Sequence, residues 1–230
     1  MMIHNKTYVV TLDGPSGTGK GTICHMLAKY LNWHFLDSGV IYRLLAYAAK
    51  KKSISFDNAA ELVACAHQMR LHFATDDHNN NLVYLNDEEI YSQLRLEACG
   101  HDASLIATIP EVRIALLEKQ RAFVKPPGLI ADGRDMGTVV FPNADLKIYL
   151  DASIEERVKR RYLQLKDKSN NVSLAQVRKE LIKRDCRDKT RDCAPLKIAR
   201  HAIVVDTTEL TIVQSFEQVL VLVQKHLFHS

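Results

Sequence analysis

The chain has 230 residues, a length that suits one domain, with room for a small inserted lobe. Apolar residues make up 47% and charged residues 25%, which is ordinary for a globular protein with a packed core. The net charge of +4 is only mildly basic, whereas non-specific nucleic-acid binding usually requires a stronger basic stripe. We therefore expect no nucleic-acid partner.

The cysteines and the hydropathy pattern indicate the cellular compartment. The chain has five cysteines, an odd number, and no two of them have the CxxC spacing, which is typical of reduced thiols in a cytosolic protein. The first residues carry no apolar signal region, and no run of 18 apolar residues occurs. The sequence predicts a soluble, cytoplasmic protein without a membrane partner, and we expect a monomer.

The N-terminal part alternates between apolar strands and amphipathic helices. Tyr8–Asp13 is an apolar, β-branched run and predicts a buried strand. A glycine-rich loop follows over Gly14–Gly21, and Thr22–Leu31 has the apolar spacing of a helix. A short strand over Phe35–Ser38 and a helix over Ile41–Lys51 are expected next.

Residues 53–102 depart from the alternation of buried strands and long helices, and they predict an inserted lobe. Met69–Phe73 and Leu82–Asn86 have the pattern of short strands. The polar tract Asp76–Asn81 between them predicts a hairpin loop. Helical pattern resumes over Ala103–Phe123.

The C-terminal part again alternates. Three further apolar runs predict buried parallel strands: Leu129–Asp132, Leu146–Leu150 and Ala202–Asp206. Helices are expected over Ile154–Lys166, Leu174–Arg191 and Ile212–His226. Strands alternating with helices predict a doubly wound α/β fold around a five-stranded parallel sheet, with a small β-rich insertion. The expected core comprises 1–52 and 103–230, the insertion 53–102, and a short lid 157–187.

The glycine-rich loop is the strongest chemical signal. Its nine residues are Gly14, Pro15, Ser16, Gly17, Thr18, Gly19, Lys20, Gly21 and Thr22. Glycines let the backbone N–H groups surround phosphate oxygens, and the following helix adds its positive N-terminal dipole. Lys20 supplies a charge for the transferring phosphoryl group. An incidental glycine-rich turn is the plainer interpretation, but the strand before and the helix after favour a phosphate-binding P-loop.

One departure bears on the metal. The strict P-loop pattern has Ser or Thr after the lysine to ligate Mg²⁺, but this chain has Gly21, followed by Thr22. Mg²⁺ is therefore expected to be held mainly by phosphates and water, with Thr22 or Asp132 assisting. Asp132 ends an apolar strand, and two interpretations stay open: a carboxylate that orients Mg²⁺, or a cap for the turn before Gly133. Asp13 is interpreted as structural.

The segment Gly133–Thr138 follows that strand, at the edge where open α/β sheets bind ligands. Arg134 is suited to binding a phosphate, and Asp135 to accepting hydrogen bonds from the amino group of a base. An internal salt bridge is the alternative, which the location disfavours.

Two helical stretches are rich in arginine. Arg184, Asp188 and Arg191 have i, i+4, i+7 spacing, which predicts one helix face. Arg157 and Arg161 precede the polar tract and are candidate contacts to a triphosphate. A solvated charged face is the usual explanation for such runs, but the planar fork of Arg is suited to gripping phosphate.

Two explanations apply to the polar residues at the start of the helix that follows the second strand. Ser38 is a natural N-cap after Asp37. A cap does not explain Tyr42 and Arg43 one turn later, so these are candidate substrate contacts.

Together these motifs resemble the bacterial-type cytidylate kinases, in register from about residue 8 to 206. The segment Gly133–Thr138 is the most specific part of the match. The resemblance implies a P-loop NTPase-type three-layer fold and phosphorylation of CMP and dCMP by ATP with Mg²⁺. It implies that Ser38, Arg113 and Asp135 read cytosine, that Arg43, Arg134 and Arg191 hold phosphate, and that Ser104, Arg184 and Asp188 meet the ribose.

Two alternative functions remain. One is a P-loop kinase acting on another nucleoside monophosphate or a small acceptor such as shikimate. The other is a nucleotide switch or a nucleic-acid-binding P-loop module. A GTPase switch would carry an Asn-Lys-x-Asp guanine motif, which the sequence lacks.

Overall fold

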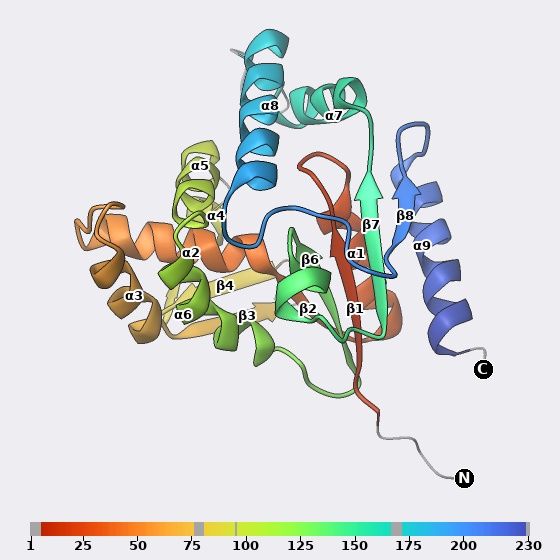
Figure 1. The fold of residues 1–230 in the computed structure, drawn as a ribbon, viewed down its shortest axis with the longest axis horizontal. Helices are drawn as coiled ribbons and strands as arrows, with labels where there is room; N and C mark the ends of the chain where they lie inside the picture. Colours follow the sequence, from red (N-terminus) through yellow and green to blue (C-terminus); the bar gives the residue numbers. More distant parts are fainter. Residues whose placement is uncertain (1–5, 76–80, 95, 167–171, 229–230) are drawn as a thin grey trace. The chain divides into compact units, whose positions relative to one another are not determined.

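A computed structural model describes residues 6–75, 81–94, 96–166 and 172–228 (Figure 1). The chain divides into two compact units, which are described separately below. The first comprises Met1–Asp37 and Arg121–Ser230, and the second comprises Ser38–Gln120.

The first unit is built on a five-stranded sheet in the order β2-β6-β1-β7-β8. Its strands are β1 (Tyr8–Asp13), β2 (His34–Asp37), β6 (Gly128–Gly133), β7 (Leu146–Asp151) and β8 (Ile203–Asp206). Every pairing is parallel, which confirms the predicted sheet and its α/β class. In the register, Asp132 lies opposite both Leu12 and Asp37, so the polar residues that end these strands meet at one edge.

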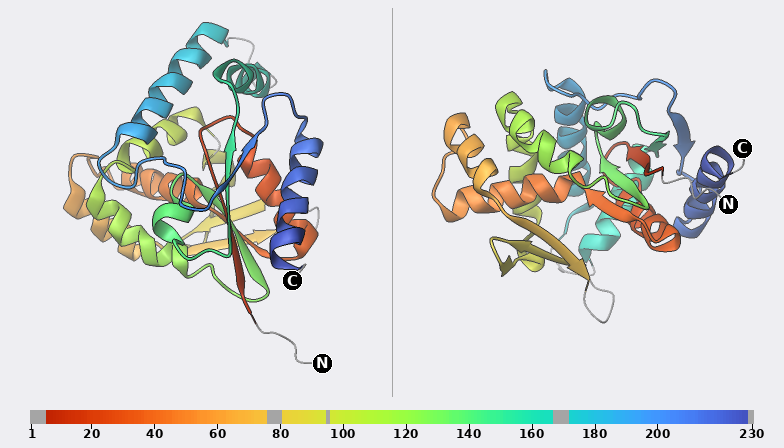
Figure 2. Two further views of the ribbon diagram at one scale, coloured as in Figure 1. Left: turned by 45° about the vertical axis from the view of Figure 1, so that its right-hand side comes forward. Right: turned by 90° about the horizontal axis from the view of Figure 1, so that it is seen from below.

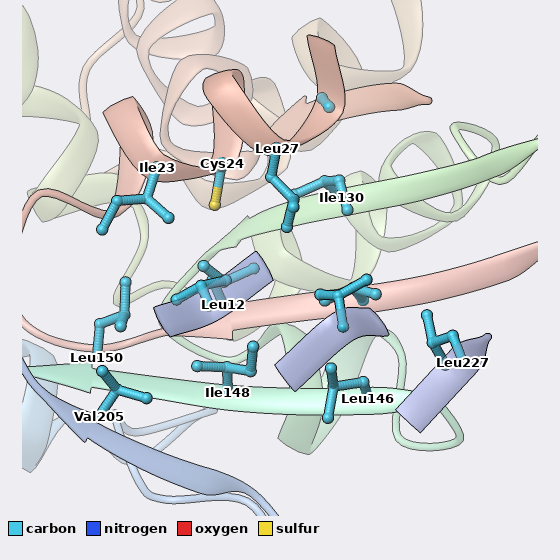
Figure 3. Close-up of a cluster of buried hydrophobic side chains, with 14 residues drawn as sticks. Leu12, Ile23, Cys24, Leu27, Ile130, Leu146, Ile148, Leu150, Val205 and Leu227 are labelled. Carbon is cyan, nitrogen blue, oxygen red and sulfur yellow. The ribbon is translucent and has the colours of Figure 1, made fainter. Parts of the chain in front are cut away.

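Helices cover the sheet and bury its apolar side chains. Those that pack on its strands are α1 (Lys20–Leu31), α9 (Ile212–Leu227) and the π-helix η1 (Met136–Val140), while α7 (Ile154–Lys166) and α8 (Leu174–Thr190) pack on each other. Helices α1 and α9 pack side by side (Figure 2). Their apolar faces meet those of the strands in a core that includes Leu12, Leu27, Ile148 and Val223 (Figure 3). This core fixes β1 and α1, and therefore the two ends of the glycine-rich loop.

Strand β8 shows where the predicted burial was wrong. It is the edge strand of the sheet, and only Val205 is buried, whereas Val204 is 52% exposed. An apolar run indicates a strand, but its place in the sheet order depends on pairing, which periodicity does not encode.

Helices α7 and α8 pack on each other through Val158, Val177 and Leu181. The predicted helix over Ile154–Lys166 is confirmed, and α8 ends at Thr190, one residue before the predicted end. The hydrophilic tract Asp167–Asn171, placed in the predicted lid, lies outside the described residues.

The second unit combines helices with a small antiparallel sheet. It contains α2 (Ser38–Lys51), α3 (Ala59–Gln68), β3 (Leu71–Thr75), β4 (Asn81–Leu85), β5 (Glu88–Glu89), α4 (Tyr91–Leu94), α5 (Glu97–Ile106) and α6 (Pro110–Arg121). The antiparallel pairing of β3 with β4 confirms the predicted hairpin. The predicted loop residues 76–80 lie outside the described residues.

Several helices of this unit were missed by the sequence analysis. Helix α3 begins after Asn58, whose side chain accepts a hydrogen bond from Glu61 N at 3.1 Å, a capping signal present in the sequence. The helical pattern expected over Ala103–Phe123 is formed by two helices, α5 and α6, of which α5 begins earlier, at Glu97. The break falls just before Pro110, as the restriction on residues that precede proline would favour. Within the described ranges, no helix is both long and apolar enough to cross a membrane.

Candidate active site

The glycine-rich loop connects β1 to α1 with a backbone that requires glycine. Gly14, Gly17 and Gly19 have φ angles of 146°, 87° and 88°. These values fall where side chains are sterically disfavoured. Gly19 is also the N-cap of α1, so the loop ends at the positive end of a helix dipole. The conformation fits the predicted phosphate-binding role.

Two loop glycines also allow close approach of neighbouring chain. A Cβ at Gly14 would lie 2.0 Å from the backbone oxygen of Leu150 in β7. A Cβ at Gly17 would lie 3.0 Å from the Cβ of Arg157 in α7. The loop is therefore held between the end of β7 and the first turns of α7.

Lys20 and Asp132 form the charged centre beside this loop. The Nζ of Lys20 donates to Pro15 O at 2.6 Å and lies 3.3 Å from Thr18 Oγ1. Burial, and then the charge of Arg134, lower the pKa of Lys20. Burial raises the pKa of Asp132 against the opposing charge of Lys20. Burial therefore disfavours the charged form of both groups, and a bound polyphosphate would favour the charged ammonium of Lys20.

The approach of Asp132 to α1 depends on Gly21. A Cβ at Gly21 would lie 3.3 Å from Asp132 Oδ2, so the carboxylate occupies space that a larger residue would contest. Asp132 Oδ1 is buried and has no hydrogen-bond partner among the described residues. Thr22, the other predicted metal residue, is exposed on α1. A carboxylate thus stands next to the position where the strict motif has a hydroxyl.

Arg134 is held by the helix that the sequence analysis singled out. Its Nε donates to Asp188 Oδ2 at 2.8 Å, and its Nη1 donates to Gly133 O at 3.1 Å. Burial opposes ionisation of Asp188, but the guanidinium groups of Arg134 and Arg184 hold its pKa below the ordinary value. Asp188 is therefore an ionised anchor for two predicted substrate residues.

Asp135 and Arg191 form a second pair. Arg191 Nη2 lies 3.6 Å from Asp135 Oδ1, with both side chains almost fully buried, and Arg191 Nε donates to Ala194 O at 2.7 Å. The prediction that Arg191 shares a helix face with Arg184 and Asp188 was wrong. Arg191 caps the C-terminus of α8 with an extended backbone, so the tertiary structure and not helical spacing positions it.

Arg157 of α7 contacts the backbone of the glycine-rich loop. Its Nη1 donates to Ser16 O at 3.0 Å and to Asp185 Oδ2 at 2.6 Å, and its Nε donates to Ala152 O at 3.1 Å. Arg157 thus connects the glycine-rich loop Gly14–Thr22, called the phosphate loop below, to α8. Arg161, one turn later, donates to Gln164 at 3.2 Å and is half-buried. Their assignment to ATP stays a prediction.

The second unit carries the remaining predicted substrate residues except Asp37, which ends β2 in the first unit. Ser38 is the first residue of α2, one turn before Tyr42 and Arg43. The guanidinium carbon of Arg113 on α6 lies 5.4 Å from the ring centroid of Tyr42, within range for a cation–π contact. Arg43 donates to Leu94 O, and Ser104 is buried on α5.

The structure therefore brings together the predicted residues of the first unit through carboxylates. The sequence analysis assigned no role to Asp185, and it interpreted Asp13, whose carboxylate accepts hydrogen bonds from Met136 N and Gly137 N, only as structural. The position of Asp13, directly before Gly14 at the end of a buried strand, could have indicated a supporting role at the site. Asp185 is buried beside an arginine of another helix, which no local pattern shows.

Comparison with known proteins shows which family the chain belongs to. Residues 10–225 match the model of the family described as Cytidylate kinase. The chain is 50% identical over 219 residues to a Cytidylate kinase of Aeromonas salmonicida, covering 95% of both chains. It is 51% identical over 217 residues to one of Pseudomonas fluorescens, covering 94% of both. The earlier resemblance is confirmed, and the chain belongs to the cytidylate kinase family.

Proposed function

We propose that this protein transfers the γ-phosphoryl group of ATP to the phosphate of CMP and dCMP. The observation that carries the proposal is the cluster at the carboxyl ends of β1 and β6. There Lys20 of the phosphate loop lies beside Asp132, while Arg134 of the following segment is anchored on Asp188. Cations from a donor loop and from an acceptor segment are what a transfer from a triphosphate to a nucleoside monophosphate requires, because both reactants are anions.

The donor side is the loop Gly14–Thr22. Its backbone N–H groups and Lys20 would bind the phosphates of ATP, with Arg157 and Arg161 contributing from α7. The contact of Arg157 with Ser16 O supports an indirect role as well, because it fixes the loop that surrounds the phosphates.

The acceptor side is assigned by family membership, residue by residue. Cytosine would be read by Ser38, Arg113 and Asp135, the phosphate held by Arg43, Arg134 and Arg191, and the ribose met by Ser104, Arg184 and Asp188. Asp37 and Tyr42 would complete this side. The ionised state of Asp188 supports a role in holding arginines for an anionic substrate.

The chain fits Mg²⁺ through one carboxylate. The buried Oδ1 of Asp132, which has no hydrogen-bond partner among the described residues, is an oxygen of the type that Mg²⁺ and its waters prefer. Asp132 would hold the ion through water, with Thr22 assisting, and the phosphates would supply the remaining ligands. Bound Mg²⁺ would neutralise charge on the transferring phosphates.

Transfer would proceed in line without a strong general base, because the acceptor phosphate is already ionised. Positioning and charge neutralisation by Lys20, Arg134 and Arg191 would supply most of the acceleration. We assign 53–102 to binding of the nucleoside monophosphate and 157–187 to a lid, within a core of 1–52 and 103–230. Both would exclude water from the reaction. We further propose a cytoplasmic monomer without nucleic-acid or membrane partners.

A substrate panel tests the proposal. ADP formation from ATP and Mg²⁺ would be measured with CMP, dCMP, UMP, AMP and shikimate, together with GTP hydrolysis and a salt series for polynucleotide binding. We expect turnover with CMP and dCMP. Robust turnover of AMP or shikimate with none of CMP would overturn the assignment, and GTP hydrolysis alone would favour a switch protein.

A further inference from the structure

Asp13 lies where the donor loop and the acceptor segment meet. It is the last residue of β1, directly before Gly14, and only 3% of it is exposed. Its Oδ1 accepts a hydrogen bond from Met136 N and its Oδ2 accepts one from Gly137 N, both at 2.8 Å. One carboxylate therefore connects the start of the phosphate loop with the segment that carries Arg134 and Asp135.

These two N–H groups are the first of η1, where a helix has no carbonyl of its own to accept them. Buried donors of this kind need a partner from elsewhere. The residue in the N-cap position is Asp135, a type that ordinarily caps, yet its side chain makes no capping hydrogen bond. Its carboxylate faces Arg191 instead. Asp13 thus caps this helix from another strand, and Asp135 points elsewhere.

The close approach is built into the chain by Gly137. A Cβ there would lie 2.9 Å from Thr11 Oγ1 and 3.3 Å from Asp13 Oδ2. The 2.9 Å contact is closer than a Cβ normally comes to another atom, so a larger residue would require Thr11, Asp13 or η1 itself to shift. Gly137 and the carboxylate of Asp13 therefore both contribute to the contact between η1 and the end of β1.

We propose that Asp13 is a positioning residue for phosphoryl transfer. By capping η1 in place of Asp135, it fixes Arg134 against the phosphate loop and leaves the Asp135 carboxylate to select the acceptor base. This inference rests on the proposed function. Asp13 itself touches no substrate, since its two oxygens are directed at backbone N–H groups.

The test uses Asp13→Asn in the full-length protein, with rates measured against CMP, UMP and ATP. The asparagine amide keeps one oxygen that can accept a hydrogen bond, but its NH2 group would face the other backbone N–H of η1, which then lacks an acceptor. We expect KM for CMP to rise about tenfold and kcat to fall about tenfold, with KM for ATP within about twofold. The preference for CMP over UMP should fall about tenfold, because Asp135 loses its alignment with the amino group of cytosine.

Asp151→Asn is the matched control, because Asp151 also ends a buried strand, but among the described residues its carboxylate accepts a hydrogen bond from its own neighbour, Ala152 N, at 2.9 Å, and from no distant segment. It should leave every constant within about twofold of wild type. Gly137→Ala is the second variant, for the case in which Asp13→Asn does not fold. It should reproduce the loss of CMP preference with Asp13 intact.

A purely structural role for Asp13 would lower thermal stability and leave the CMP-to-UMP ratio and both KM values unchanged. That result in either folded variant overturns the inference, as does failure of both variants to fold when Asp151→Asn folds normally, since the residue is then needed for the fold itself. Absence of CMP turnover in the wild-type protein would instead overturn the proposed function.

Discussion

The phosphate loop and the segment Gly133–Thr138 both follow buried strands of one sheet, but they are built by different means. The loop gains its shape from glycines with positive φ, and its main-chain N–H groups are the groups predicted to bind phosphate. The segment presents side chains, and carboxylates from elsewhere hold them: Asp188 holds Arg134, and Asp13 holds the start of η1. A site made of backbone is encoded locally, whereas a site made of side chains depends on partners distant in the sequence.

The largest expected effect is on the loop. Lys20→Met should lower kcat by about 10³-fold or more, because the charge that follows the phosphoryl group is lost. Thermal unfolding should not occur at a lower temperature, because burial makes the ammonium costly in the nucleotide-free protein. Lys29→Met, in the last turn of the same helix, is the control and should retain activity. Near-normal turnover of Lys20→Met would refute the role of Lys20.

Gly14→Ala tests whether the loop depends on its backbone alone. Because the new Cβ would lie 2.0 Å from Leu150 O at a φ of 146°, we expect the free energy of unfolding to fall by about 3 kcal/mol or more. Gly21→Ala meets only a side-chain oxygen at 3.3 Å and should change stability by no more than about 1 kcal/mol. Urea unfolding of both variants measures the difference, and equal stabilities would contradict the contrast.

The junction between the two regions should respond to pH. Burial, opposed by the hydrogen bonds from Gly137 and Met136, raises the pKa of Asp13 to about 6. A folded-state pKa above the ordinary 3.8 means that the group contributes stability that is full below 3.8 and lost as pH rises through 6. Relative to Asp13→Asn, the wild-type free energy of unfolding should fall by about 3 kcal/mol across that window. Parallel stability curves for the two proteins would show that Asp13 has an ordinary pKa.

Arg134→Lys tests the acceptor segment. A lysine cannot donate to Asp188 and Gly133 O in the fork that Arg134 uses, so kcat/KM for CMP should fall about 100-fold. KM for ATP should stay within about twofold, because the donor loop is unchanged. Arg178→Lys, an exposed arginine of α8 paired with Glu155, is the control. An equal rise in both KM values would mean that the two regions do not divide donor from acceptor.

Most of the fold could be predicted from local pattern. The apolar runs and the glycines located β1, β6 and β7 to within about a residue, and the loop between β1 and α1. The prediction was weaker for the second unit: α4 has only four residues, and α3 was missed although Asn58 offers a capping signal before it. The π-helix η1 was missed because its first turn is capped by Asp13, far away in the sequence, and not by a neighbouring residue.

The sequence by itself determined the phosphate loop, the parallel sheet and the family, because each depends on residue types at short, fixed spacing. The tertiary structure alone decided which carboxylate holds which cation: Asp185 with Arg157, Asp188 with Arg134, and Asp135 with Arg191. It also decided that Asp13, and not Asp135, caps η1. Such pairings form where distant segments are packed to a few ångströms, and burial then makes each unpaired charge too costly to leave.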